Sequence, residues 1–351
     1  MLPTRTEIIL KSIVEQYITK ATPVPSQSVT GNHELGVSTA TIRNEMSYLE
    51  QEGYIIRPHP SAGSIPSDKG YRHYVESLGN IKLPLTEQRL VSHLFHQVER
   101  ELDEWLNLAA TLIAQMVQNA AIVTMPKSKA CQFKHLELVS LQDSTVLFIL
   151  VLDGINVKQQ LITLDEMTSQ AVLTTIASKL STSYSSLTRS QILTKGTDLT
   201  ATEQQITDCL LKVMETEDNQ ESEERYLDGL HFVLNQPEFA HNQRMLTLME
   251  LIEQRHLLRS IIPPKLASGR VQVIIGKENK TEAIHNYSVV ISQYGLPKEA
   301  VGTIGVVGPT RMPYARTIAT VGFLSLVLSG LAARLYGREI SAELNLNTTT
   351  E

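Results

Sequence analysis

Five side chains near the start of one predicted helix are of the types that bind the edges of DNA bases. The helix is predicted from Thr39 to about Gln51, and the side chains on or near its polar face are Ser38, Thr39, Thr41, Arg43 and Asn44. Small hydroxyl residues let a helix approach a groove closely, while arginine and asparagine can make bidentate contacts with guanine and adenine, each worth about 1–3 kcal/mol of discrimination. On this pattern alone, a merely solvated helix face is an equally good interpretation.

A second group of polar and basic side chains follows this helix, in a stretch that cannot be helical. Residues 54–56 are of β type, and the prolines and glycine between residues 57 and 66 exclude a helix, so the stretch predicts a two-stranded wing. Its candidate contacts to phosphate or the minor groove are Arg57, His59, Ser61 and Ser64, with Lys69 and Arg72 just behind them. The wing favours DNA binding over a solvated face.

Three predicted helices position these two groups. An apolar stripe at helical spacing predicts a helix from Thr4 to Tyr17, which residues 22–25 end. Ser26 is expected to cap a short second helix running to about Leu35, and Gly36 to supply the turn that follows.

The third helix has both a start signal and a core face. Ser38 is a good N-cap, and Ile42, Met46 and Leu49 repeat at i, i+4 and i+7, so they must point into a core. Two helices joined by a tight turn and followed by a hairpin describe a winged helix-turn-helix, which places the start of its second helix in the DNA major groove.

Net charge does not by itself indicate DNA binding. The 351 residues include 31 Lys+Arg and 37 Asp+Glu, a net charge of -6, and residues 1–80 hold 7 basic and 8 acidic residues. The chain is therefore no polycation that would coat nucleic acid or an anionic membrane. We expect modest, salt-sensitive affinity per head, with dimerisation supplying some of the binding strength.

The rest of the chain predicts an α+β architecture with an antiparallel sheet interrupted by a helical insertion. A linker precedes one long helix, capped by Thr86 and running from Glu87 to about Ala121. Strands are expected at 133–141, 145–152 and 157–164, with Asp153-Gly154 as a turn, and a helix at 166–182. Mostly helical structure follows to about residue 264, then strands at 271–275, 288–293 and 302–307, and a last helix at 313–335.

No residue set for catalysis or metal binding stands out. The chain lacks the GxSxG, GxxxxGK[ST] and HExxH motifs, and the GxxGxxG run of Gly302, Gly305 and Gly308 spans a predicted strand, which favours tight packing over phosphate binding. Cys131 and Cys209 form no disulfide framework or zinc motif. We expect no enzyme, no cofactor and no metal, a cytoplasmic location, and burial of the uncharged stretch 317–333 rather than a membrane span.

Three separated motifs resemble the HrcA family of bacterial heat-inducible transcription repressors. They are residues 38–46 (STATIRNEM), 58–72 (PHPSAGSIPSDKGYR) and 301–312 (VGTIGVVGPTRM), in the order in which that family has them. The resemblance covers about residues 4 to 335. It departs at Ser64, where the family usually has Arg, and at residues 25–27, which read Pro-Ser-Gln instead of Gly-Ser-Arg.

The resemblance implies a homodimeric repressor with a winged-helix head, a GAF-like domain and a dimerising insertion within that domain. Its expected partners are double-stranded DNA carrying the inverted repeat called CIRCE, a second copy of itself, and the chaperonin GroE, which keeps the repressor active. The expected domains are a winged helix at 1–78, a linker at 79–86, a GAF-like domain formed by the two segments 87–185 and 265–340, a helical dimerising insertion at 186–264, and a polar tail at 341–351.

A different class of function remains open on the residues. A GAF-like domain could sense a small metabolite, which would make the chain a metabolite-sensing winged-helix regulator with chaperonin dependence secondary. The sequence does not single out pocket residues for such a ligand, so the repressor of chaperonin genes is the leading hypothesis.

Overall fold

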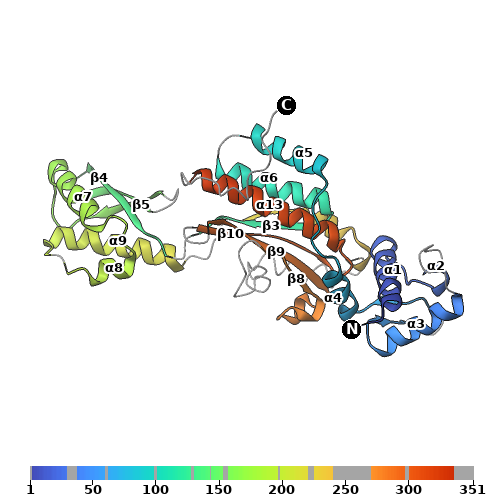
Figure 1. Ribbon diagram of the computed structural model, residues 1–351. Helices are drawn as coiled ribbons and strands as arrows, with labels where there is room; N and C mark the ends of the chain where they lie inside the picture. Colours follow the sequence, from blue (N-terminus) through green and yellow to red (C-terminus); the bar gives the residue numbers. More distant parts are fainter. Residues whose placement is uncertain are drawn as a thin grey trace. The chain divides into compact units, whose positions relative to one another are not determined.

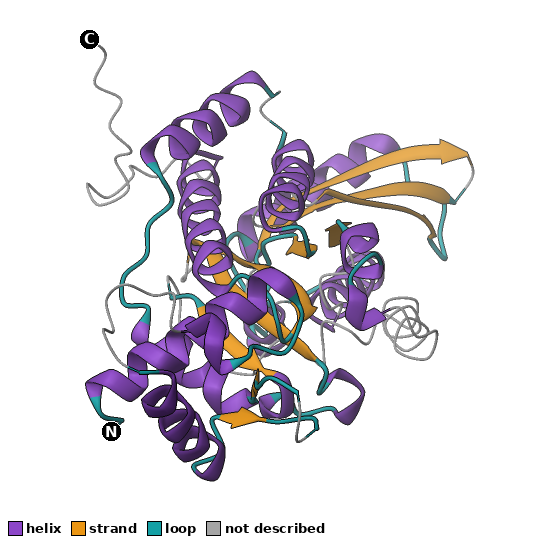
Figure 2. Cartoon of the chain, turned by 90° about the vertical axis from the view of Figure 1, so that its right-hand side faces the viewer, coloured by secondary structure: helices purple, strands orange, loops and turns teal. Residues whose placement is uncertain are grey.

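The computed structural model divides the chain into two compact units, which are described separately (Figure 1). One unit comprises residues 1–125, 224–295 and 302–351, and the other residues 126–223 and 296–301. The residues that the structure describes are 2–29, 38–59, 62–98, 101–127, 130–142, 144–152, 157–196, 198–219, 225–239, 270–296 and 300–335. Figure 2 distinguishes the helices from the strands along the chain.

The first 78 residues form helices around a small two-stranded sheet. Their elements are α1 Thr4–Lys20, α2 Ser26–Val29, α3 Thr39–Gln51, β1 Ile55–Ile56, β2 Ile65–Pro66 and α4 Asp68–Ser77. The predicted bounds of α3 are confirmed, and its Ile42, Met46 and Leu49 are buried as their spacing required. β1 and β2 pair antiparallel, with Ile55 opposite Pro66. The expected continuation of α2 to Leu35 and the turn at Gly36 lie outside the described residues.

A five-stranded sheet forms the centre of the first unit. Its strand order is β7-β3-β10-β9-β8, from the strands β3 Ala120–Thr124, β7 Arg225–Asp228, β8 Gln272–Ile275, β9 Tyr287–Leu296 and β10 Ala300–Pro309. The pairs β3–β7, β3–β10 and β8–β9 are antiparallel. This mixture of helices with antiparallel sheets is the predicted α+β class, and it is consistent with a GAF-like domain.

Helices cover one face of this sheet. They include α6 Leu102–Val117 and α13 Tyr314–Leu335, which Figure 1 shows side by side over β3 and β10, while α5 Leu85–Gln97 packs against α6. Ile113 of α6 and Leu324 of α13 share a core with Ile304 and Val306 of the sheet. The opposite face has its own apolar cluster around Ile122, where the short helix α10 Leu230–Leu234 packs.

The prediction of one long helix from Glu87 to about Ala121 is wrong in three respects. The helix is broken between α5 and α6, because Val98 and Glu101 both have extended backbone. Thr86 does not cap it, since α5 begins at Leu85 after Pro84. Gln118, with φ of 55°, ends α6, and the next residues form β3, which is buried between β7 and β10. β7 was also missed, because its segment was expected to be helical.

The three glycines of the GxxGxxG run lie where the backbone packs closely, as predicted. A Cβ on Gly302 would lie 2.4 Å from the ring of Tyr294, and a Cβ on Gly308 would lie 2.1 Å from Asn119 Oδ1. Gly305 approaches the main chain of β9, where an added Cβ would be 3.1 Å from a carbonyl oxygen. The run therefore serves sheet and helix packing.

The second unit is built on a three-stranded antiparallel sheet of order β4-β5-β6. Its elements are β4 Phe133–Gln142, β5 Thr145–Leu152, β6 Val157–Thr163, α7 Gln170–Tyr184, α8 Arg189–Thr194 and α9 Ala201–Asn219. The three predicted strands are confirmed, while the turn at Asp153-Gly154 lies outside the described residues. Phe148 of β5 shares one core with Leu180 of α7 and Leu210 of α9. The structure thus groups these strands with α8 and α9, whereas the expected division separated them at residues 185 and 186.

One helix of the described chain, α13, is long and apolar enough to cross a membrane by length and composition. More than half of its apolar window, 56%, is buried inside the fold. Thr317, Thr320 and Leu324 are among its buried residues, so the predicted burial of this stretch is confirmed.

Candidate nucleic-acid interface

The polar face predicted on α3 is present, and a cap fixes the start of the helix. Ser38 Oγ accepts a hydrogen bond from the backbone N–H of Thr41 at 3.2 Å and lies 3.0 Å from the Thr41 hydroxyl. Arg43 and Asn44 are exposed one turn further along, whereas Thr39 and Thr41 are half-buried. The two side chains with the greatest capacity for bidentate hydrogen bonds therefore lie at the accessible surface near the start of the helix.

The other side of α3 is held against α1 by a carboxylate. Glu45 accepts hydrogen bonds from the Thr6 hydroxyl at 2.7 Å and from Arg5 Nε and Nη2 at 3.0 and 2.7 Å. The Thr6 bond and then Arg5 lower the pKa of Glu45, so its carboxylate stays ionised. The negative charge of Glu45 is thus balanced by Arg5, and Arg5 in turn is committed to this contact.

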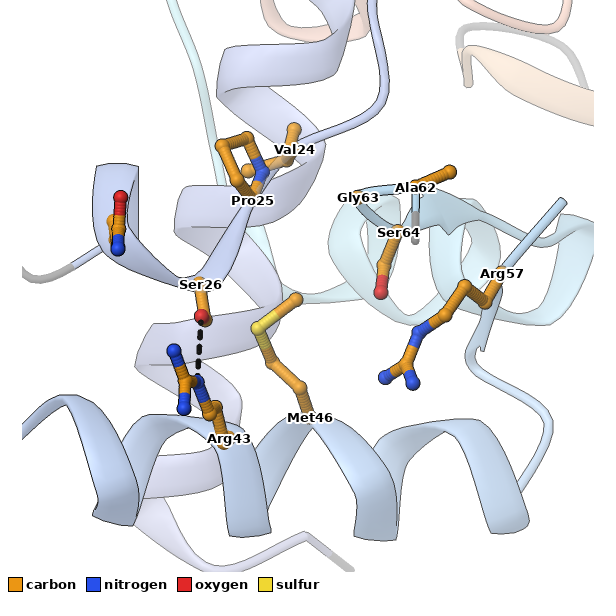
Figure 3. A pocket seen from close by; sticks show the side chains of 10 residues that line it. Val24, Pro25, Ser26, Arg43, Met46, Arg57, Ala62, Gly63 and Ser64 are labelled. Atoms are coloured by element: carbon orange, nitrogen blue, oxygen red, sulfur yellow. Dashed lines mark hydrogen bonds between the residues drawn. The ribbon is translucent and has the colours of Figure 1, made fainter. Parts of the chain in front are cut away.

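An open hollow of about 400 Å³ lies between α3 and the hairpin (Figure 3). We call it the head hollow; it is lined by residues 24–27, by Arg43 and Met46 of α3, and by residues 57 and 62–64. Figure 3 shows Arg43 beside Ser26 on one side of Met46 and Arg57 on the other. Arg43 Nε donates to Ser26 Oγ at 3.4 Å, and among the described residues Arg43 makes no ion pair.

The hairpin is fastened to the chain before α2, which gives the head hollow its shape. Val24 N donates to Ser64 O at 2.8 Å and Ser64 N donates to Val24 O at 2.9 Å. A Cβ on Gly63 would lie 2.5 Å from the carbonyl carbon of Val24, so only glycine permits this close approach. The positions of Ser64 and of α2 are therefore coupled.

The predicted hairpin contacts differ in what they can reach. Arg57 is half-buried and its Nη2 lies 3.1 Å from Glu50 Oε2. His59 is exposed, and Ser61 lies outside the described residues. Ser64 is 1% exposed, and its hydroxyl has no hydrogen-bond partner among the described residues. Arg57 and His59 thus remain candidates for an approaching DNA backbone, and Ser64 can meet a ligand only inside the head hollow.

The two basic residues behind the hairpin serve contacts within the protein. Lys69 Nζ donates to Glu52 O at 2.7 Å and lies 4.1 Å from the centre of the Tyr54 ring. Arg72 pairs with Glu278 through two nitrogens and donates to Val273 O at 2.8 Å. The expectation that Arg72 contacts phosphate therefore has no support in the geometry, because its donors face the edge strand β8 and the turn after it.

Two residues of this surface escaped the sequence interpretation. Ser26 was expected only as a helix cap, but its hydroxyl accepts from Arg43. Glu50 was not among the candidate residues, but its carboxylate pairs with Arg57. Neither contact has a sequence signal, since each joins segments whose approach depends on the fold.

Among the described residues, neither cysteine is an activated nucleophile and no metal site is present. Burial raises the pKa of the Cys131 thiol to about 12 and also raises that of Cys209, so both thiols stay protonated near neutral pH. Over the described ranges, no group of three or more His, Cys, Asp and Glu side chains could hold a metal ion. The chemistry available at the surface of α3 and the hairpin is hydrogen bonding and charge pairing.

Comparison with known proteins places the chain in a family. The family model for the HrcA protein C terminal domain matches residues 103–318. The heat-inducible transcription repressor HrcA of Dehalococcoides mccartyi is 54% identical over 338 residues, covering 96% of this chain and 98% of the relative. The repressor of the same name from Roseiflexus castenholzii is 40% identical over 349 residues, covering 96% of each chain.

A solved structure agrees in fold. The crystal structure of a hypothetical protein determined at 2.2 Å resolution superposes with a TM-score of 0.64 at 22% identity, covering 95% of this chain and all of the other. Family model and relatives together cover nearly the whole sequence, including all three motifs from which the resemblance was inferred. The chain belongs to the HrcA family of heat-inducible transcription repressors, which is not a family of enzymes.

Proposed function

We propose that this chain represses chaperonin genes by binding a CIRCE-like inverted repeat as a homodimer, with α3 of each winged helix-turn-helix in the major groove. The observation that carries the proposal is the exposed pair Arg43 and Asn44 on a helix that Ser38 caps, next to a hairpin, in a member of a repressor family. Two heads related by a two-fold axis would read the two halves of the repeat.

We place the dimer interface on the three-stranded sheet of the second unit, outside the segment 186–264 in which the resemblance implied it. Side chains alternate along β5, so that Val146, Phe148 and Leu150 face the core while Leu147, Ile149 and Val151 face the other way. The strand register brings these residues beside further apolar side chains on the same face: Val139, Val157 and Leu161. Val157 is 58% and Leu161 65% exposed, as expected of a face that a second copy would cover.

Leu161→Asp should convert the dimer into a folded monomer, because a carboxylate at this apolar position of the face would have to be desolvated on association. Sedimentation equilibrium measures the mass, and circular dichroism measures the helix content. The matched control is Gln160→Asp, on the same strand but directed to the opposite face. A dimer that survives Leu161→Asp would refute this assignment of the interface.

Regulation by heat and by the chaperonin GroE is proposed from the family resemblance, as is action in the cytoplasm. The chaperonin would keep the repressor competent, so that unfolded protein occupying the chaperonin would release the genes. Operator binding measured with and without chaperonin across temperature tests this regulation. Binding that depends on neither would remove the regulatory proposal and leave DNA binding intact.

The central test is a fluorescence anisotropy titration with an inverted-repeat duplex and a scrambled duplex of the same composition. Specific DNA-binding proteins prefer their sites by factors of about 10³ or more at physiological salt. We expect a preference of that order, decreasing affinity with rising salt for both duplexes, and a stoichiometry of one dimer per repeat. Equal affinity for the two duplexes would overturn the proposal.

The metabolite-sensing alternative gains no support from the head hollow, which lies in the first 66 residues and not at the five-stranded sheet. A native-state ligand of the GAF-like domain would raise the melting temperature, with a stabilisation that grows as the logarithm of one plus the ratio of the ligand concentration to Kd. Thermal-shift screening with cell metabolites therefore separates the two hypotheses.

A further inference from the structure

The Ser64 hydroxyl is buried and unpaired, although the main-chain groups of the same residue are both bonded. The main-chain N–H and C=O of Ser64 both pair with Val24, but its Oγ has no partner among the described residues. A buried hydroxyl without a partner is costly, and native proteins rarely leave one unless water or a ligand satisfies it. Figure 3 shows this hydroxyl pointing into the head hollow from the hairpin side.

The lining of the head hollow suits an anion. It includes the guanidinium groups of Arg43 and Arg57 and the hydroxyls of Ser26 and Ser64, and none of its described lining residues is acidic. Arg57 reaches toward the hollow on the same side of Met46 as Ser64. A phosphate group matches this combination, because guanidinium and hydroxyl donors converge on several oxygens of one anion.

Arg57 can take a second anionic partner without losing its first. Its ion pair with Glu50 involves one nitrogen at 3.1 Å, and the two side chains are 32% and 36% exposed. A guanidinium has five N–H donors, and a pair with this exposure contributes little net free energy. Glu50 therefore reduces the positive charge of Arg57 but does not block it.

We infer that the head hollow binds one phosphate group of the DNA backbone, with Arg57 and the Ser64 hydroxyl as donors, beside Arg43 at its other wall. This inference rests on the proposed function and deepens it. It assigns Arg57 and Ser64 to a phosphate contact that positions the protein on DNA, and Arg43 to a base contact that recognises the sequence. One phosphate seated in this hollow would set how far α3 enters the groove.

The first test compares two variants, Ser64→Ala and Arg57→Gln, on operator and scrambled duplexes. Each variant should lose about tenfold in affinity, by the same factor on both duplexes, because a phosphate contact carries no sequence information. Arg57→Gln should also reduce the slope of log K against log salt by about 0.9 per head. Ser64→Ala should leave the free protein as stable as before or more stable, since it removes an unpaired buried hydroxyl.

The control for charge is Lys11→Gln. Lys11 is an exposed cation on α1 with Glu7 and Glu15 four residues to either side, so its removal should leave both affinities and the salt slope unchanged.

A second pair of variants compares Glu50→Gln with Glu52→Gln. Both remove one acidic charge near the hairpin, but only Glu50→Gln frees Arg57, so its gain in affinity should be larger and should disappear when Arg57→Gln is also present.

The position of the phosphate is tested with duplexes that carry one neutral methylphosphonate at a time. One position in each half-site should weaken binding of the unaltered protein and have no further effect on Arg57→Gln. A thermal-shift assay with inorganic phosphate at constant ionic strength tests whether the hollow binds a free anion. If inorganic phosphate stabilises the protein while Ser64→Ala and Arg57→Gln bind DNA as tightly as the unaltered protein, the hollow binds a free anion and not a phosphate of the DNA backbone.

The proposed function and the phosphate site fail in different ways. If the unaltered protein does not prefer the inverted repeat, the proposed function fails. If it does prefer the repeat while Ser64→Ala and Arg57→Gln bind as tightly as it does, only the phosphate site fails. A loss of affinity by Ser64→Ala on the operator alone would also overturn the phosphate site, because it would mark a base contact.

Discussion

Arg43→Ala should weaken operator binding by about 1–3 kcal/mol per head and leave the affinity for scrambled DNA nearly unchanged. Arg43 is exposed at the start of α3, and its contact within the protein is a long hydrogen bond to Ser26. Its guanidinium is therefore available for a base edge, and losing it removes discrimination rather than general attraction. Anisotropy titrations with both duplexes at several salt concentrations measure the two affinities.

Arg72→Gln is the control variant for Arg43→Ala. Both substitutions remove an arginine from the first 78 residues, but Arg72 is bonded to Glu278 and Val273. Its loss should lower stability and leave the ratio of operator to scrambled affinity as it was. If Arg43→Ala weakens both duplexes equally, Arg43 contacts a phosphate and the base contact must be sought at Asn44.

Arg311→Met should lower the free energy of unfolding of the first unit by about 2–4 kcal/mol, because it would remove the partly buried ion pair that Arg311 makes with Glu238. The Arg311 side chain is 14% exposed and donates to Glu238 Oε1 at 2.5 Å and Oε2 at 3.3 Å. It also donates to the main-chain oxygen of Ile18, at the end of α1, at 2.7 Å. The single tryptophan, Trp105, is buried in α6 of the same unit, so its fluorescence in a urea titration reports this loss.

Arg316→Met is the matched control for Arg311→Met. Arg316 also pairs with a glutamate, Glu87, at 3.1 Å, but the two side chains are 43% and 31% exposed. An exposed pair of this kind contributes at most about 1 kcal/mol. Arg316 also donates to a main-chain oxygen, that of Met116, at 2.7 Å, so the two arginines differ mainly in exposure. Equal effects of the two substitutions would show that the lower exposure of the pair between Arg311 and Glu238 adds nothing to its contribution.

Local patterns were enough to predict α3 and much of its chemistry. Ser38 caps the helix through a hydrogen bond to Thr41, three residues away, and Ile42, Met46 and Leu49 define its buried face by spacing alone. Such signals depend on neighbours within one or two turns, so they can be recognised in a sequence. The exposed positions of Arg43 and Asn44 follow from the same periodicity.

Contacts between distant segments could not be predicted in this way. β3 was assigned to the end of a helix because its partners, β7 and β10, lie about 100 and 180 residues further along the chain. Arg72 was assigned to DNA because its partner, Glu278, is 206 residues away. The head hollow depends on the bridge between Val24 and Ser64, which no local sequence pattern predicts. In each case a contact between distant segments determined the structure, and the local sequence pattern did not.

The contacts of Arg72 have a consequence for the orientation of the DNA-binding segment. Arg72 and the start of α4 are bonded to β8 and the turn after it, where Lys277 N also donates to Asp68 Oδ2 at 3.0 Å. Among the described strands, β8 lies at the edge of its sheet and pairs with β9. Edge strands fray at lower free energies than central ones. The orientation of α3 therefore depends in part on the local stability of this edge strand, besides the bond from Arg311 to the main chain of Ile18.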